Sequence, residues 1–95
     1  MRLKLQFLLQ PRVWAVLKEL SWGDRFESDL GKIIEEVNGG PEGLMEIKHR
    51  LLEMGLIYQL KGERGSPYLA LTYKGQEIVG RLMKAEEILD FNNES

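Results

Sequence analysis

Residues 44–72 constrain the fold most, because an apolar helical face is followed at once by two short extended runs. Leu44, Ile47, Leu51 and Met54 recur at spacings of three and four, which places them on one face of a helix. Gly55 comes next and tolerates the left-handed backbone that commonly ends a helix. We therefore expect a helix over residues 41–54 that ends at Gly55.

The two extended runs predict a β-hairpin. Residues 56–60 and 68–71 consist mostly of leucine, isoleucine and tyrosine, and residues 61–67 between them are dense in turn formers. Thr72 then stands where it can cap a closing helix that we expect over residues 73–91.

Two further amphipathic helices precede this unit. Pro11 suits the first turn of one, whose apolar stripe runs to Leu20, and Ser28 is placed to cap the other, which runs to residue 37. Phe26 is expected to anchor the connection between them in the core. Residues 1–10 alternate at first and then become apolar, so a short strand and an extra helical turn both stay open.

This order of elements resembles a winged helix-turn-helix domain, most closely the transcription regulators of the PadR, MarR and ArsR type. The phrase "YLALTYKGQEI" and the turn at residues 38–41 carry part of the resemblance, which covers about residues 12–90. It implies one α+β domain over residues 1–95. A three-helix core with a hairpin wing would occupy residues 11–72, and a long helix over 73–91 would follow.

The closing helix has the pattern of a surface for a second copy. Ile78, Leu82, Ala85 and Leu89 keep the 4-3-4 spacing of a coiled-coil seam over about two heptads. Neighbouring apolar residues widen this face, so one flank can pack on its own domain while the other meets a partner. We expect a homodimer that uses this helix, with help from residues 1–10.

The resemblance also implies double-stranded DNA as a partner. In winged-helix regulators the helix equivalent to 41–54 enters the major groove, and the hairpin tip contacts the phosphate backbone. The residues expected at the groove are Lys48, His49 and Arg50, and those expected on the backbone are Lys61 and Arg64. Each residue also has a structural alternative. Charged side chains on a solvent-facing helix are often only solubilising, and a basic residue in a hairpin tip commonly protects the edge of a sheet from pairing with another chain.

Charge balance favours a second hypothesis. The chain carries a net charge of −2, and residues 42–54 combine Glu42, Glu46 and Glu53 with Lys48 and Arg50. An acidic helix face is repelled by phosphates. The alternative is therefore a winged-helix module that binds a basic protein partner through this acidic face, and the sequence leaves both hypotheses open.

Other classes of function have little support in the sequence. The chain has no cysteine and a single histidine, and it contains neither a P-loop nor a nucleophile elbow, so we expect no enzyme activity. Glu46 and Glu53 share a helix face with His49, but no second segment offers ligands, so we expect no metal or cofactor. No apolar run is long enough for a membrane span or a secretory signal, and we expect a cytoplasmic protein with no assigned effector site.

Overall fold

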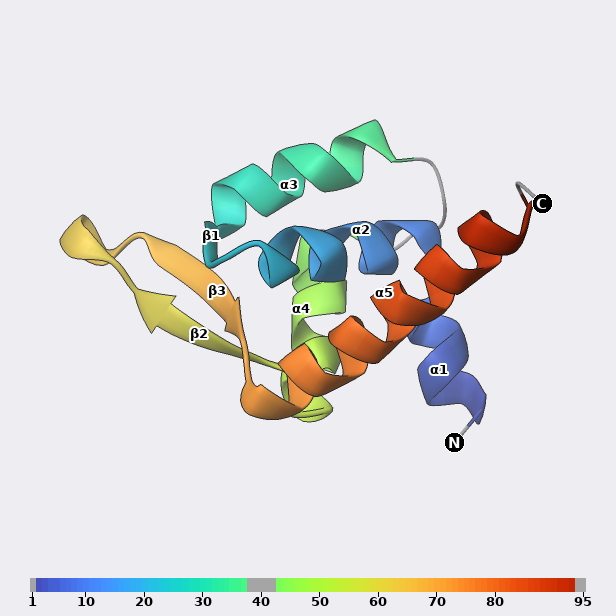
Figure 1. Ribbon diagram of the computed structural model, residues 1–95. Coiled ribbons are helices and arrows are strands. Elements are labelled where there is room, and N and C mark those ends of the chain that lie inside the picture. The colour runs from blue at the N-terminus through green and yellow to red at the C-terminus, as the bar shows by residue number, and fades with distance from the viewer. Residues whose placement is uncertain (1, 38–42, 94–95) are drawn as a thin grey trace.

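The computed structural model describes residues 2–37 and 43–93 (Figure 1). The helices over these residues are α1 (Arg2–Leu8), α2 (Pro11–Ser21), α3 (Glu27–Glu36), α4 (Leu44–Glu53) and α5 (Tyr73–Asn93). The strands are β1 (Arg25–Phe26), β2 (Ile57–Lys61) and β3 (Pro67–Leu71), with a 3-10 turn at Glu63–Gly65 between the last two.

All five of these helices and a small sheet contribute side chains to the core. The sheet is antiparallel with strand order β1-β3-β2, and Gln59 of β2 pairs with Leu69 of β3. The β2–β3 hairpin projects away from the helices, while α5 runs from the base of the hairpin past α2 toward the C-terminus (Figure 1). Helices α2, α3 and α4 with this hairpin and α5 form the winged helix-turn-helix arrangement that the sequence predicts.

The predicted inner face of α4 is confirmed. Ile47 and Leu51 are fully buried, and Leu44 and Met54 are partly buried against the same cluster. This cluster also takes fully buried side chains from most other elements of the chain, namely Phe7, Leu17, Leu30, Leu56, Leu69 and Val79. The core is therefore continuous from α1 to α5, which fixes the orientation of α4 and of the hairpin relative to each other.

The predicted signals at the two ends of the 44–72 unit are confirmed as well. Gly55 has a φ of 73°, and the backbone N–H groups of Gly55 and Leu56 donate to the carbonyls of Leu52 and Leu51. This pair of hydrogen bonds forms a Schellman motif, which satisfies backbone carbonyls at the end of α4. Thr72 accepts a hydrogen bond from the backbone N–H of Gly75 at 3.0 Å and so caps α5.

The structure decides between two open alternatives in the first half of the chain and corrects two expectations there. Residues 2–8 form a helix, because Phe7 and Leu8 are adjacent in sequence and both enter the core, whereas adjacent strand residues point to opposite faces. Helix α3 begins at Glu27 with Phe26 as the N-cap, so Ser28 is inside the helix and not its cap. Phe26 is 47% exposed and contacts Tyr68 edge-to-face at 6.0 Å between ring centroids, since β1 places it beside β3.

Other predicted boundaries agree within a few residues. The helix expected over 41–54 is observed from Leu44, and residues 38–42, with the predicted turn and Glu42, lie outside the described residues. Within the described ranges no helix combines the length and apolarity needed to cross a bilayer.

Candidate nucleic-acid interface

The outer face of α4 is exposed along its whole length. Its exposed side chains include Glu46, His49 and Glu53, together with the apolar side chains of Met45 and Leu52, which are 57% and 37% exposed. This α4 outer face therefore carries two carboxylates and one imidazole on a partly apolar surface.

Lys48 lies elsewhere than on this outer face. Its side chain is buried, and its ammonium donates to the Glu27 carboxylate of α3 at 3.1 Å. The pair connects the two helices of the helix-turn-helix, so in this arrangement the Lys48 charge is already neutralised within the protein. The DNA contact expected of Lys48 stays a prediction, and the observed geometry gives the side chain a structural contact instead.

Arg50 is exposed at the surface but stacks on a neighbouring helix. The guanidinium carbon lies 3.8 Å from the centroid of the Phe7 ring in α1. A planar guanidinium over an aromatic face is a favourable cation–π arrangement, and its edge N–H groups remain available to acceptors. Arg50 therefore joins α1 to α4 and still presents charge beside His49.

The wing tip is a tight turn with two exposed basic residues. The Gly62 N–H donates to the Ser66 carbonyl at 2.8 Å, and the Gly65 N–H donates to the Gly62 carbonyl at 3.1 Å. Arg64 has φ 64° and ψ 16°, the left-handed region that glycine and asparagine favour. Arg64 and Lys61 are both exposed, and Glu63 lies between them.

The five predicted DNA contacts thus divide into three environments. His49 and Arg50 are on the exposed side of α4, Lys61 and Arg64 are on the projecting hairpin, and Lys48 is held between α3 and α4. No group of three potential metal ligands converges in the residues that the structure describes, although His49 shares a face with two glutamates.

The predicted seam of α5 is only partly free. Ile78 and Leu82 are half-buried, while Ala85 is exposed and Leu89 is 65% exposed. A different face of α5 holds the helix on its own domain: Val79 is buried, and Glu86 accepts a hydrogen bond from the Trp14 indole at 3.2 Å. The second half of the seam is therefore the part available to another chain.

The structure adds exposed apolar residues that the seam did not include. On α5 these are Ile88 and Phe91, at 52% and 74% exposure. Leu5 on α1 and Leu9 just after it are 48% and 52% exposed. The sequence identifies these residues as apolar, but whether they are exposed depends on how α1 and α5 pack on the rest of the domain. The role of residues 1–10 in dimerisation stays a prediction, and the exposure of Leu5 and Leu9 leaves both side chains accessible to a second copy.

The fold is shared with solved structures of transcriptional regulators. Similar structures include a mutant of ZitR from Lactococcus lactis in apo form (TM-score 0.63, 20% identity, 84% of this chain and 61% of that chain) and a transcriptional regulator from Clostridium thermocellum (TM-score 0.61, 22% identity, 84% of each chain). A possible transcriptional regulator for arsenical resistance is also similar (TM-score 0.55, 18% identity, 95% of this chain and 93% of that chain). The chain thus spans less than two thirds of the length of ZitR. No protein-family model matches the chain, and no curated protein is significantly similar to it in sequence.

Proposed function

We propose that this protein is a homodimeric, cytoplasmic DNA-binding transcriptional regulator and not an enzyme. In this proposal α4 faces the major groove with His49 and Arg50, and the wing places Lys61 and Arg64 on the phosphate backbone. Lys48 contributes indirectly, because its pairing with Glu27 fixes α4 against α3. The likeness to regulator structures supports the class of function.

The observation that carries the proposal is the cationic tip of the wing. Arg64 occupies a left-handed conformation that costs about 1–2 kcal/mol for a residue with a Cβ. Gly65, in the same region of φ at 76°, adopts it without that cost. An arginine at the strained position is accounted for if its guanidinium is needed at the tip, where a phosphate would accept its hydrogen bonds.

The dimer is proposed to form through the free half of the α5 seam. Ala85 and Leu89 are exposed there, with Ile88 and Phe91 nearby. Pairing two copies doubles the small DNA contact of a single winged helix and places two α4 helices about one DNA turn apart.

The direct test is fluorescence anisotropy of the full chain with mixed genomic duplex DNA across a salt series. We expect binding whose logarithmic affinity falls linearly with the logarithm of salt concentration. In the Lys61→Glu, Arg64→Glu double variant this slope should become less steep by about two, because about one unit is lost for each phosphate contact. A matched control is Lys32→Glu with Lys84→Glu, which makes the same change in net charge at exposed sites on α3 and α5.

The control separates a specific wing contact from a general effect of charge. If both double variants weaken binding equally, the wing is not the contact site. Absence of binding by the wild-type protein at low salt would refute the proposal as a whole. The dimer is tested separately by sedimentation of Ala85→Lys with Leu89→Lys, which should yield folded monomers because both side chains are exposed in the protomer.

A second candidate function rests on the composition of the α4 outer face. Met45 and Leu52 are exposed beside Glu46 and Glu53, and an apolar stripe flanked by carboxylates suits a basic, amphipathic protein segment. Under this alternative, Glu46→Lys with Glu53→Lys would abolish partner binding, whereas under the DNA proposal the same change would strengthen DNA binding. The two functions therefore predict opposite results from one variant.

A further inference from the structure

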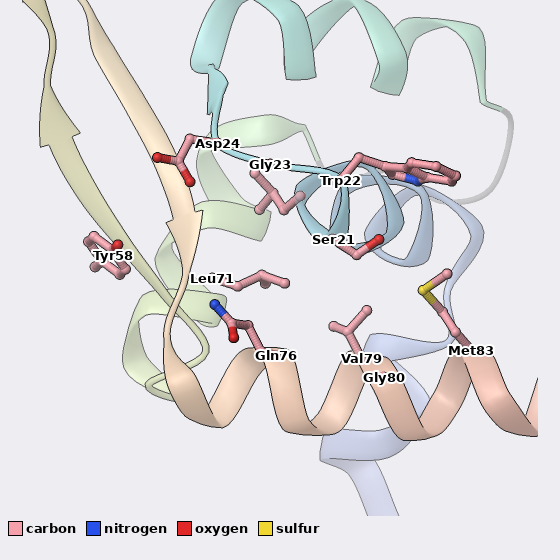
Figure 2. A pocket seen from close by; sticks show the side chains of 11 residues that line it. Ser21, Trp22, Gly23, Asp24, Tyr58, Leu71, Gln76, Val79, Gly80 and Met83 are labelled. Atoms are coloured by element: carbon pink, nitrogen blue, oxygen red, sulfur yellow. The ribbon is translucent and has the colours of Figure 1, made fainter.

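A half-open cavity of about 430 Å³ lies outside the proposed DNA contacts, between α2, the hairpin and α5. Figure 2 shows Gln76, Val79 and Met83 rising from α5 toward Leu71 of β3 and the end of α2. Its volume lies in the range of small-molecule sites, which is about 300–1,000 Å³. The apolar part of the lining comes from Leu20, Leu71, Val79 and Met83.

Gly80, on the α5 wall of this cavity, has no steric explanation within the protomer. A Cβ built on Gly80 meets no atom within 4 Å, whereas a Cβ on Gly75 of the same helix would lie 2.1 Å from the Leu56 carbonyl oxygen. Glycine is the least favourable helix residue after proline, so a glycine in the middle of a helix needs a reason. At Gly75 the reason is the close contact with the Leu56 backbone. At Gly80 a glycine is accounted for if a bound molecule enters the space next to it.

The position of Gly80 on α5 argues against a second copy of the chain as the occupant. At about 100° per residue, Gly80 lies about 160° around the helix from Ile78, which begins the proposed seam. Another cavity, of about 320 Å³, lies between α1 and α5 and includes Ile78 itself, so it belongs with the seam. A second copy that pairs through the seam would therefore lie on a different side of α5 from the Gly80 cavity.

The charge of the lining favours a cation over an anion. Its one formal charge comes from the Asp24 carboxylate, and none of the described residues that line it is a lysine or an arginine. Tyr58, which is 43% exposed, borders the cavity on the same side as Asp24, and an aromatic face attracts cations (Figure 2). The Trp22 ring points away from this side (Figure 2).

The guanidinium of Arg25 lies beside Gly23 and donates to the backbone carbonyl of Asp24 at 3.0 Å. Its charge is paired with the Glu19 carboxylate at 2.9 Å. The Asp24 carboxylate itself has no such ion pair within the described ranges.

We propose that this cavity is a binding site for a small apolar molecule that carries one ammonium group. The apolar body would occupy the space over Gly80 against Leu71 and Val79. The ammonium would lie at the rim, where the Asp24 carboxylate and the Tyr58 ring accept it, and Gln76 offers a further polar group. The inference does not depend on DNA binding, since it rests on the cavity alone.

The test is nuclear magnetic resonance titration of the ¹⁵N-labelled full chain with three probes that share an indole ring. Tryptamine carries the ammonium, tryptophol a hydroxyl and indole-3-propionate a carboxylate. We expect tryptamine to bind with a Kd of about 1 mM or tighter and to shift the amide signals of Gly23 and Gly80. Tryptophol should bind several-fold more weakly, and the carboxylate should not saturate.

Two variants locate the site. Gly80→Leu fills the space above α5 with a good helix former and should weaken tryptamine binding at least about tenfold. Glu87→Leu is the matched control, since it adds the same side chain to an exposed part of α5 outside the cavity and should leave binding unchanged. Asp24→Asn should reduce the affinity for tryptamine to that for tryptophol.

Several results would overturn the proposal. One is equal or tighter binding of indole-3-propionate, and another is full tryptamine affinity in Gly80→Leu. No saturable shift with tryptamine at about 10 mM would also overturn it. If Gly80→Leu changes the sedimentation coefficient of the unliganded protein to that of a monomer, the cavity is an interface between copies and not a ligand site.

Discussion

The ammonium of Lys48 in α4 and the carboxylate of Glu27 in α3 form an ion pair of 3.1 Å. Their side chains are 9% and 14% exposed, so most of the pair is removed from water. The pair spans the two helices of the helix-turn-helix and therefore holds the orientation of the α4 outer face. Loss of the pair should therefore lower the stability of the fold and weaken binding by the α4 outer face.

Removing one member of this pair should destabilise the fold strongly. Lys48→Met leaves Glu27 charged, poorly hydrated and without its partner, and we expect a loss of about 2–4 kcal/mol in the free energy of unfolding, measured with urea. Adding Glu27→Met to Lys48→Met should recover part of this loss. The exposed Arg81–Glu77 pair is the control, and Arg81→Ala should cost at most about 0.5 kcal/mol. A loss below about 1 kcal/mol for Lys48→Met would mean that the pair is effectively solvated.

Replacing Arg50 should loosen the contact of α1 with α4. The guanidinium lies over the Phe7 ring, so Arg50→Ala should lower the free energy of unfolding by about 1 kcal/mol. Arg50→Lys keeps the charge but not the planar stacking group, so it should show part of the same loss. If DNA affinity falls in Arg50→Ala but is retained in Arg50→Lys, the DNA contact requires only charge at this position.

The sequence predicts the elements whose signals are local. The inner face of α4, the stop at Gly55 and the cap at Thr72 each depend on residues a few positions apart, and all three are confirmed. Strand β1 has two residues, too few for any periodicity, and it pairs with β3 more than 40 positions later. This pairing determines where α3 begins and why Phe26 lies at the surface.

The environment of Lys48 could not be predicted from neighbouring residues either, because its partner is distant in sequence. A helical wheel places Lys48 at the side of α4, but its burial depends on Glu27, which is 21 positions earlier. The stacking of Arg50 on Phe7 likewise depends on how α1 packs. Of the contiguous basic residues 48–50, only His49 has neither of these contacts. The sequence alone does not distinguish the three residues in this respect.

Replacing Arg64 should separate stability from binding. Arg64→Gly removes the cost of the left-handed conformation but adds freedom to the unfolded chain, so the free energy of unfolding should stay the same or rise by up to about 1 kcal/mol. If the guanidinium contacts a phosphate, DNA affinity should fall and the salt slope should decrease by about one. Unchanged DNA affinity and salt slope would show that Arg64 is not a contact.

The same glycine-to-alanine change should have opposite effects at two positions of α5. At Gly75 the new Cβ would lie 2.1 Å from the Leu56 carbonyl oxygen, a backbone atom that cannot yield without moving the junction of α4 and β2. We expect Gly75→Ala to cost about 3 kcal/mol or more, in the range of severe steric or backbone disruption.

At Gly80 the new Cβ meets nothing within 4 Å, so only the helix preference remains. Gly80→Ala should raise the free energy of unfolding by about 0.5–1 kcal/mol. Thermal and urea denaturation of both variants measure the contrast directly. A neutral result at Gly75 would mean that α5 shifts easily against Leu56, and a loss at Gly80 would mean that the space above it is occupied in the folded protein. The Gly75 variant therefore tests how closely α5 packs against Leu56, and the Gly80 variant tests whether the cavity side of α5 is unoccupied in the folded protein.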